Sequence, residues 1–391
     1  MRAKHCDRRE FLRAIGTGAL AGGALAGAGL APAPVSALGA LRAPLRADRK
    51  TRHVVFIAFA GGVRSRETFG MPASVPNMKA MADEGVLYPR ARTSNLGHFG
   101  AAMSLFTGIS EARGIRENAR GTDPTIFEYL RKDLALPQSE VWVTTTGGAQ
   151  QVNYSYGLHP DYGPQYGANT LDGDGIFNKK FRAVFERYGM PKAMEPGEAA
   201  ALETLRGSLR ARGSEEEGAA LERVERYILD ELTSGTSSLS GVNAGDAKAL
   251  RLARNLLSIF RPRVIGVVLQ NADVAHGSYA GYLEVIRRND AAIGELWTAV
   301  KEDEELAGST AFFVLPEFGR DRDLNPRRGL DHGDGSDELN YVSCLAWGPD
   351  FKRGAVVRDD VRTIDVTPTI CDLFGAEARL ARGKKLPGLF A

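Results

Sequence analysis

Short runs of apolar residues recur along the chain, and stretches with a helical pattern separate them. Runs without polar interruption are typical of strands that are buried on both faces, as in a parallel sheet. Within residues 279–300, apolar side chains recur at helical spacing and predict a helix with one buried face. The alternation predicts an α/β fold, a doubly wound and mostly parallel sheet sandwiched by helices. The five predicted strands are residues 53–59, 141–146, 264–269, 311–315 and 342–347.

Capping residues predict two further helix boundaries. Asp123 followed by Pro124 is typical of an N-cap and a first-turn proline. Asp365 and Pro368 open a short helix near the C-terminus, and this helix is expected to end near Gly375.

One region interrupts the alternation between the second and third predicted strands. Residues 153–175 are rich in Tyr, Gly, Asp and Pro, and residues 196–261 are charged and helical in pattern. We therefore expect a loop and helical insertion at 153–261 within a single domain at 51–391. Ligands of such folds bind beyond the carboxyl ends of the strands. The insertion is expected to lie over that edge of the sheet.

The first forty residues have a different character. Residues 7–13 resemble the twin-arginine export signal, with Arg8 and Arg9 followed by Phe11. The following stretch is uncharged, rich in Ala and Gly, and interrupted by prolines. A membrane anchor is the alternative, which this weakly apolar composition disfavours. We expect residues 1–40 to be a signal peptide that the twin-arginine export machinery recognises, and the protein to be periplasmic or secreted.

Charge and cysteine content narrow the possible partners. The signal holds five of the 50 basic and two of the 48 acidic residues, which leaves a net charge of −1 for the rest of the chain. A neutral body lacks the basic surface of a nucleic-acid-binding protein, so no nucleic-acid partner is expected. Cys6 belongs to the signal, and Cys344 and Cys371 lie in apolar segments where buried thiols are expected.

Short motifs follow the predicted strands in a characteristic order. The motifs are Ala60-Gly61-Gly62-Val63-Arg64, Pro76-Asn77, Glu84-Gly85-Val86, Thr107-Gly108, Asp273-Val274-Ala275-His276-Gly277, Glu317-Phe318-Gly319-Arg320, Asp331-His332-Gly333, Trp347-Gly348-Pro349 and residues 365–370. This succession, which spans most of the chain beyond residue 50, resembles the alkaline phosphatase superfamily in its sulfatase-like and phosphodiesterase branches. Together with the export signal, the motif at 317–320 resembles more narrowly a twin-arginine-exported branch of that superfamily.

The resemblance implies a metal site at the carboxyl ends of the strands. Asp273, His276 and His332 fall on metal-binding positions, and Glu317 falls where a second ion would be held. Asp and His ligands suit zinc, with manganese or calcium as alternatives. Three protein ligands leave a fourth position open, which is the catalytic rather than the structural arrangement.

Three positions depart from the pattern that the resemblance implies. Ala60 or Gly61 stands where the superfamily has a metal-binding Asp at the end of the first strand. Glu317-Phe318 stands in place of an Asp-His pair. The position of the nucleophile, ten residues before the glycine of the Thr-Gly motif, holds His98 rather than Ser, Thr or Cys.

These departures leave several roles open. His98 is a candidate metal ligand, general base or covalent nucleophile, with a packing histidine as the structural alternative. Arg64 and Arg320 could pair with an anionic phosphate or sulfate, or could form ordinary salt bridges. His159, in the expected insertion, could reach the site.

Two functions from different classes remain. The first is an extracytoplasmic, metal-dependent hydrolase that attacks a small anionic phosphate or sulfate ester with metal-activated water. The second is a non-catalytic member that keeps the fold and binds a ligand or partner, which the changes at the nucleophile and first-strand positions favour.

Overall fold

A computed structural model describes residues 46–110, 120–146, 151–171, 241 and 243–391. These residues belong to one structural unit, formed by Arg42–Gly175 and Ala219–Ala391. The expected signal peptide at 1–40 lies outside the described residues, as does most of the expected insertion at 153–261. In the part of the chain that is described, no helix is both long enough and apolar enough to cross a membrane.

A nine-stranded sheet forms the centre of the described residues. Its strand order is β4-β3-β5-β1-β6-β7-β2-β8, and β9 pairs with β2. All five strands predicted from apolar runs are present, and the prediction of a mostly parallel sheet is confirmed. The strands are β1 (His53–Phe59), β2 (Val86–Arg92), β3 (Val141–Thr145), β4 (Asn169–Leu171), β5 (Val264–Leu269), β6 (Thr310–Pro316), β7 (Tyr341–Trp347), β8 (Ala355–Val356) and β9 (Val361–Arg362).

Strand direction divides the sheet into two parts. Strands β4, β3, β5, β1 and β6 run parallel, whereas β7 is antiparallel to both β6 and β2. The apolar run in β7 was expected to lie in a parallel part of the sheet, and its direction corrects that expectation. The chain leaves β6 and enters β7 at the same edge of the sheet, so the two strands must run in opposite directions.

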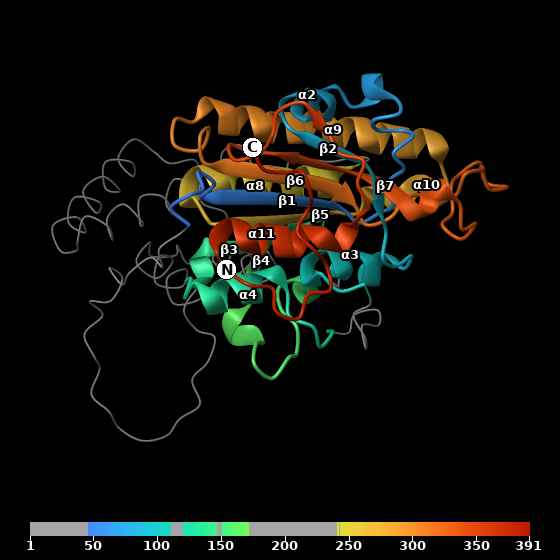
Figure 1. The fold of residues 1–391 in the computed structure, drawn as a ribbon. Helices are drawn as coiled ribbons and strands as arrows, with labels where there is room; N and C mark the ends of the chain where they lie inside the picture. The colour runs from blue at the N-terminus through green and yellow to red at the C-terminus, as the bar shows by residue number, and fades with distance from the viewer. Residues whose placement is uncertain (1–45, 111–119, 147–150, 172–240, 242) are drawn as a thin grey trace, which may run out of the picture. The chain divides into compact units, whose positions relative to one another are not determined.

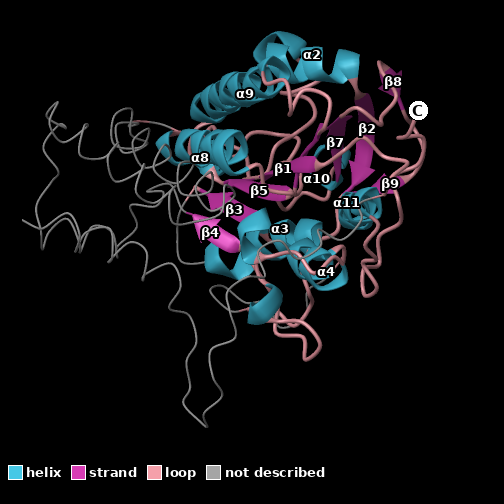
Figure 2. Cartoon of the chain, turned by 90° about the vertical axis from the view of Figure 1, so that its left-hand side faces the viewer, coloured by secondary structure: helices cyan, strands magenta, loops and turns pink. Residues whose placement is uncertain are grey.

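Helices cover both faces of the sheet (Figures 1 and 2). Helices α2, α8 and α9 lie on one face, and α3, α4 and α11 lie on the other. The helices are α2 (Pro76–Glu84), α3 (His98–Thr107), α4 (Ile126–Asp133), α8 (Ala244–Phe260), α9 (Tyr279–Glu302), α10 (Asp337–Asn340) and α11 (Val366–Phe374). Short 3-10 segments are η1 (Pro72–Ser74), η2 (Gln138–Glu140), η3 (Gln151–Tyr154), η4 (Pro164–Tyr166), η7 (Asn271–His276) and η8 (Thr363–Asp365).

Aromatic rings fill the space between the sheet and α3. Phe106 packs against Phe56 of β1 at 5.0 Å between ring centroids, and against Phe127 of α4 at 5.8 Å. A Cβ at Gly266 of β5 would lie 2.9 Å from both Phe106 and Phe127. Glycine in this strand therefore lets the two rings lie against the sheet, as expected for a close-packed interior.

The predicted helix boundaries were partly correct. Helix α11 begins after Asp365 and ends before Gly375, which has a φ of 82°. Helix α4 is capped by Thr125 instead of the predicted Asp123. Glu128 reaches back to accept a hydrogen bond from the Thr125 backbone N–H at 2.7 Å. This contact is part of a reciprocal capping box between Thr125 and Glu128, which satisfies backbone donors at the start of α4.

The described ends of the expected insertion belong to the sandwich itself. Strand β4 extends the sheet beside β3, and α8 packs on α9 and on β5. These segments therefore form an edge strand and a layer helix. Only the start of α8 reaches the carboxyl end of β5, where Asp246 accepts a hydrogen bond from the Gln270 backbone N–H. A connection between parallel strands usually contains such a helix.

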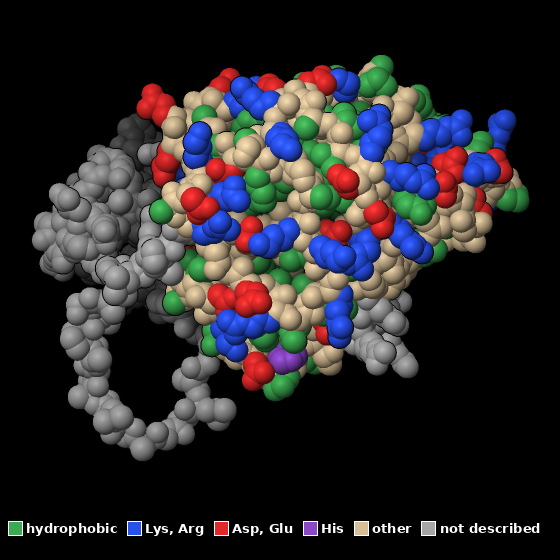
Figure 3. Space-filling model, viewed as in Figure 1, with side chains coloured by type: hydrophobic (Ala, Val, Ile, Leu, Met, Phe, Trp, Pro, Cys, Tyr) green, Lys and Arg blue, Asp and Glu red, His purple; other side chains and the backbone are tan. Residues whose placement is uncertain are grey.

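Two further sequence expectations can be checked on these residues. Cys344 and Cys371 are buried free thiols, as predicted, and burial raises the pKa of Cys344 to about 12. On the face shown in Figure 3, basic and acidic side chains are interspersed. The near-neutral charge of the body is thus also balanced locally on that face.

Candidate functional site

The candidate residues meet at the carboxyl ends of three neighbouring parallel strands, β5, β1 and β6. Segment η7 follows β5 and carries Asp273 and His276. Glu317 directly follows β6, and His98 is the first residue of α3. His332 lies in the loop between β6 and α10. All five residues predicted for the site are therefore brought to the same edge of the sheet.

The 3-10 conformation of η7 brings Asp273 and His276 to one face. Side chains three residues apart eclipse each other in a 3-10 helix, so this short spacing is sufficient. Asp273 Oδ1 lies 3.3 Å from His276 Nε2. Asp246, at the start of α8, accepts hydrogen bonds from the backbone N–H groups of Gln270 and Asn271 at 2.9 and 3.1 Å. This buried carboxylate fixes the start of η7.

His98 is held by a buried carboxylate. Its Nδ1 lies 2.6 Å from Glu317 Oε1, and the Glu317 side chain is fully buried. Burial raises the pKa of Glu317 to about 7, although His98 opposes this rise. Burial lowers the pKa of His98, but the carboxylates of Asp273 and Glu317 outweigh that effect and raise it to about 9. A proton is therefore held within this pair at neutral pH.

His276 is held in the same way by a second carboxylate. Its Nδ1 lies 2.6 Å from Asp331 Oδ1, and the side chains of both residues are partly exposed. Contact with His276 lowers the pKa of Asp331. In both pairs a carboxylate binds Nδ1, so Nε2 is the nitrogen that faces the other site residues, and at His276 it lies 3.1 Å from Arg320 Nη1. Histidines that ligate metals are commonly oriented by such partners.

The third histidine completes a cluster of rings. The ring centroid of His332 lies 4.7 Å from that of His98 and 5.1 Å from that of His276. The buried Phe318 ring lies beneath, 4.9 Å from His98. Burial lowers the pKa of His332, and the neighbouring cations add to this effect. A neutral imidazole is the form that binds metals.

The three histidines fit a metal ion. One ligand nitrogen from each of His98, His276 and His332 can be chosen so that all lie within 4.8 Å of one another. His98 Nε2 and Glu317 Oε2 are buried and have no hydrogen-bond partner among the described residues. His98 Nε2 lies 2.9 Å from Asp273 Oδ1, but this contact does not have the alignment of a hydrogen bond. His98 Nε2 therefore keeps an ion pair with Asp273, whereas Glu317 Oε2 has no partner among the described residues. A buried polar atom without a partner is rare in folded proteins and indicates a place for a ligand.

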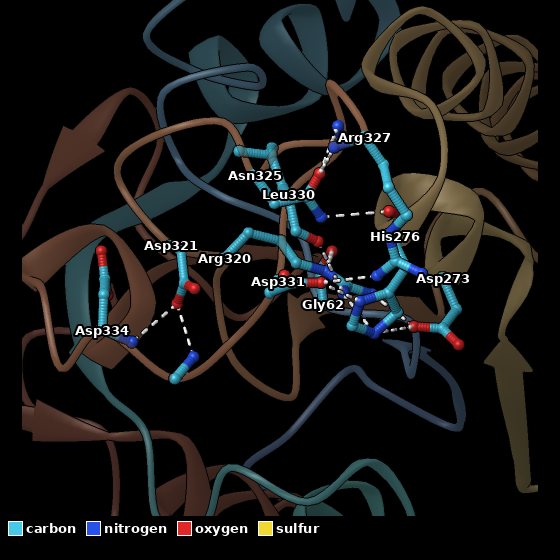
Figure 4. Close-up of polar contacts among 12 residues, drawn as sticks. Gly62, Asp273, His276, Arg320, Asp321, Asn325, Arg327, Leu330, Asp331 and Asp334 are labelled. Atoms are coloured by element: carbon cyan, nitrogen blue, oxygen red, sulfur yellow. Dashed lines mark hydrogen bonds and ion pairs between the residues drawn. The ribbon is translucent and has the colours of Figure 1, made fainter.

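Neither candidate arginine is free to bind an anionic ester. Arg64 forms a buried ion pair with Glu67 and donates to the backbone oxygens of Asp321 and Arg322 at 2.7 and 2.8 Å. Arg320 is fully buried and bonded to Asp273 and to backbone oxygens (Figure 4). The salt-bridge alternative is therefore correct for both residues.

The loop that carries His332 is fixed at both ends (Figure 4). Asp321 Oδ1 accepts hydrogen bonds from the backbone N–H groups of Gly333 and Asp334, at 2.5 and 2.9 Å. Asn325 donates a hydrogen bond to the His276 backbone oxygen at 3.1 Å, which ties the loop to η7. His159, in contrast, packs on Tyr162 and is not among the rings around His98.

Sequence reasoning missed the supporting contacts of three residues. Asp331 was recognised only as part of the motif around His332. Its position next to His332 in the sequence gave no sign that it contacts His276. Asp246 lies in a region expected to be an insertion, so its contact with η7 could not be foreseen. Arg320 was identified, but its burial depends on the loops around it and has no periodic signal.

Comparisons with known proteins show where this architecture recurs. No protein-family model and no curated protein matches the sequence. Solved structures do match, with 11–14% sequence identity. The phosphonate monoester hydrolase SpPMH from Silicibacter pomeroyi has 14% identity and a TM-score of 0.53, with 86% of this chain and 76% of that chain covered. Wild-type alkaline phosphatase PafA has 11% identity and a TM-score of 0.56, with 88% and 100% covered. The lipoteichoic acid synthase LtaP from Listeria monocytogenes has 11% identity and a TM-score of 0.51, with 89% and 80% covered.

Proposed function

We propose that this chain, which has the fold of the alkaline phosphatase superfamily, is a metal-dependent hydrolase of phosphate or sulfate esters. One observation carries the proposal: three histidines converge at the strand ends, two of them backed by carboxylates. The fold-level likeness to a phosphonate monoester hydrolase and an alkaline phosphatase supports the reaction class. The likeness alone does not assign a substrate.

His98, His276 and His332 would hold a divalent ion, with zinc as the first candidate and manganese or calcium as alternatives. Such an ion polarises an ester oxygen and lowers the pKa of a bound water. To hold such an ion, His98 would have to give up its Nε2 proton, because only a neutral nitrogen coordinates. The proposal thus makes His98 a ligand, in preference to a nucleophile.

One carboxylate next to the histidines is already neutralised by a protein cation, because Asp273 is paired with Arg320. A divalent ion held by the histidines would offset the charge of Glu317, which contacts His98. Consequently, little uncompensated negative charge remains to repel an anionic ester. Glu317 and Asp331 keep the Nδ1 protons of their histidines in place, which fixes the direction of both Nε2 atoms.

The test uses the purified full-length chain, assayed for hydrolysis of nitrophenyl phosphate mono- and diesters and nitrophenyl sulfate with added Zn²⁺, Mn²⁺ or Ca²⁺. We expect His332→Ala to lose both bound metal and activity. His159→Ala is the matched control, because His159 packs on Tyr162 away from the site. Folded wild-type protein that hydrolyses none of these esters with any of the three ions would contradict the proposal. If it still bound metal, the non-catalytic, ligand-binding alternative would be favoured.

We also propose an extracytoplasmic location, supported by the twin-arginine-like sequence at residues 7–13. Replacement of both Arg8 and Arg9 by lysine is expected to retain the protein in the cytoplasm of a host that has this export pathway. Fractionation followed by immunoblotting measures the outcome. Equal amounts of wild-type and variant protein outside the cytoplasm would refute this location.

A further inference from the structure

We infer that a surface pocket beside α10 is a second ligand site of this protein and binds the phosphate or sulfate group of a small molecule. We call it the arginine pocket, after Arg66, Arg90 and Arg358, which line it. Its volume is about 560 Å³, within the range of roughly 300–1,000 Å³ that is usual for small-molecule sites. It shares no lining residue with the histidine cluster, so the inference is independent of the proposed hydrolase activity.

Segments that are distant in sequence form the arginine pocket. Ser65 and Arg66 lie in the loop between β1 and η1, and Arg90 lies in β2. Arg358 lies between β8 and β9, and α10 contributes two acidic residues. The edge of the sheet around β2 and β7 thus brings three arginines to one concave surface.

Both acidic residues of the pocket already have cationic partners. Arg90 Nη2 lies 2.9 Å from Asp337 Oδ2, and the Arg90 guanidinium also lies 3.7 Å from the ring centroid of Tyr341. Glu338 pairs at 3.2 Å with Arg322, which belongs to the loop that carries His332 and does not line the pocket. Arg90 is therefore held in one orientation, and neither carboxylate is left to neutralise the other two arginines.

Arg66 and Arg358 keep their donors for a ligand. Both side chains are exposed, and neither forms an ion pair or a side-chain hydrogen bond with any described residue. Ser65 Oγ accepts a hydrogen bond from Ser343 Oγ at 2.9 Å, so the Ser65 hydroxyl proton is free to be donated. Guanidinium groups bind phosphate and sulfate oxygens through paired N–H donors, and the pocket therefore suits an oxyanion.

The size and the apolar part of the lining favour an oxyanion that is attached to an organic group. A bare phosphate or sulfate ion would fill only part of the volume. Pro89 and Tyr341 add carbon surface, and both are partly buried. We therefore expect a sugar phosphate or sugar sulfate to bind more tightly than the free ion.

Calorimetric titration of the purified full-length chain tests the inference without an activity assay. Metal is first removed with a chelator, so that the anions are neither hydrolysed by the proposed reaction nor bound to an ion at the histidines. The probes are glucose 6-phosphate, glucose 6-sulfate and inorganic phosphate. We expect at least one of the two sugar esters to bind more tightly than inorganic phosphate. Its affinity is expected to fall with added salt, because the arginines are exposed.

Substitutions locate the bound anion. Arg66→Gln and Arg358→Gln are each expected to weaken binding about tenfold, because each removes a hydrogen bond between charged groups. Arg66→Lys keeps the charge and is expected to lose less. Arg353→Gln is the matched control, because Arg353 is exposed just before β8 but does not line the pocket. His332→Ala alters the histidine cluster and is expected to leave the affinity unchanged.

The outcomes separate this site from the histidine cluster. Wild-type protein that binds none of the three probes, or unchanged affinity in both glutamine variants at Arg66 and Arg358, would overturn the inference. Loss of binding in His332→Ala alone would place the anion at the histidines and overturn it as well. Inorganic phosphate that binds as tightly as the sugar esters, with the same dependence on the arginines, would support the site with the free ion as its ligand. A chain that binds these anions through its arginines but hydrolyses no ester would contradict only the proposed function.

Discussion

The two histidine–carboxylate pairs have the same contact distance but different surroundings. In each pair, Nδ1 lies 2.6 Å from a carboxylate oxygen. The Glu317 side chain is fully buried, whereas the Asp331 side chain is 42% exposed. Water and salt screen the exposed pair but hardly reach the buried one. Distance alone therefore does not rank the two contacts, and burial should decide which of them contributes more to metal binding.

The largest effect is expected on the free energy of unfolding when Asp246 is replaced. Asp246 holds η7, the segment that carries His276 of the exposed pair. Asp246→Ala removes the acceptor for Thr146, Asn289 and two backbone N–H groups. Each buried group left unpaired costs roughly 1–3 kcal/mol, so we expect the free energy of unfolding to fall by about 3 kcal/mol or more. Urea unfolding measures this change.

Asp48→Ala is the matched control for that variant. Asp48 is exposed and paired with Arg46 at the surface, so its removal is expected to leave the free energy of unfolding nearly unchanged. If Asp246→Ala and Asp48→Ala lost similar free energies of unfolding, the exposed pair would not depend on Asp246 as a buried anchor.

The next largest effect is expected from Glu317→Gln. The variant keeps an acceptor for His98 but loses the charge that orients the ring and increases its basicity. Loss of such a partner typically lowers metal affinity about 10–100-fold, and we expect Zn²⁺ binding to weaken by this amount. Competition with a chromophoric chelator measures the dissociation constant. An unchanged constant would mean that the buried pair does not support a metal ligand.

Asp331→Asn tests the exposed pair by the same measurement. Because the Asp331 side chain is partly exposed, solvent replaces part of what is lost, and we expect about a tenfold weakening of Zn²⁺ binding or less. The decisive quantity is the ratio of the Zn²⁺ dissociation constants of Asp331→Asn and Glu317→Gln. A larger loss in Asp331→Asn than in Glu317→Gln would reverse the ranking by burial.

The smallest effect is expected from Arg327→Ala at the rim. Arg327 is 67% exposed and lies 3.4 Å from Asp331. Exposed ion pairs contribute roughly 0–1 kcal/mol, so Zn²⁺ affinity and melting temperature are expected to change little. Isothermal titration at low and high salt checks this. A substantial, salt-dependent loss of affinity would show that surface charge supports the exposed pair.

Central strands could be predicted from the sequence more completely than edge strands. The predicted bounds of β1 and β5 match the structure, because both strands are apolar throughout and buried on both faces. Strand β2 was missed because Pro89, Arg90 and Arg92 interrupt its apolar pattern. Strands β8 and β9 are two residues long, which is too short for any periodic pattern.

The convergence of the site residues followed from the order of elements, but the supporting contacts did not. Residues that follow neighbouring parallel strands meet at one edge, so His276 and Glu317 could be placed together. Which carboxylate binds which ring depends on loop geometry, as the contact between Asp331 and His276 shows. The buried position of Arg320 likewise depends on Gly61 and Gly62, which are distant in sequence, and on a loop contact with the Leu330 backbone oxygen.

The network around Arg320 has a consequence for how the protein matures. Arg320 and Asp331 hold η7, which carries His276, and Glu317 holds His98 at the start of α3. Ligands that are already arranged before an ion arrives need no folding step to capture it. Loading is then limited by the encounter with the ion and by proton release from His98. A protein stripped by a chelator is accordingly expected to recover its metal quickly, without passing through an unfolded state.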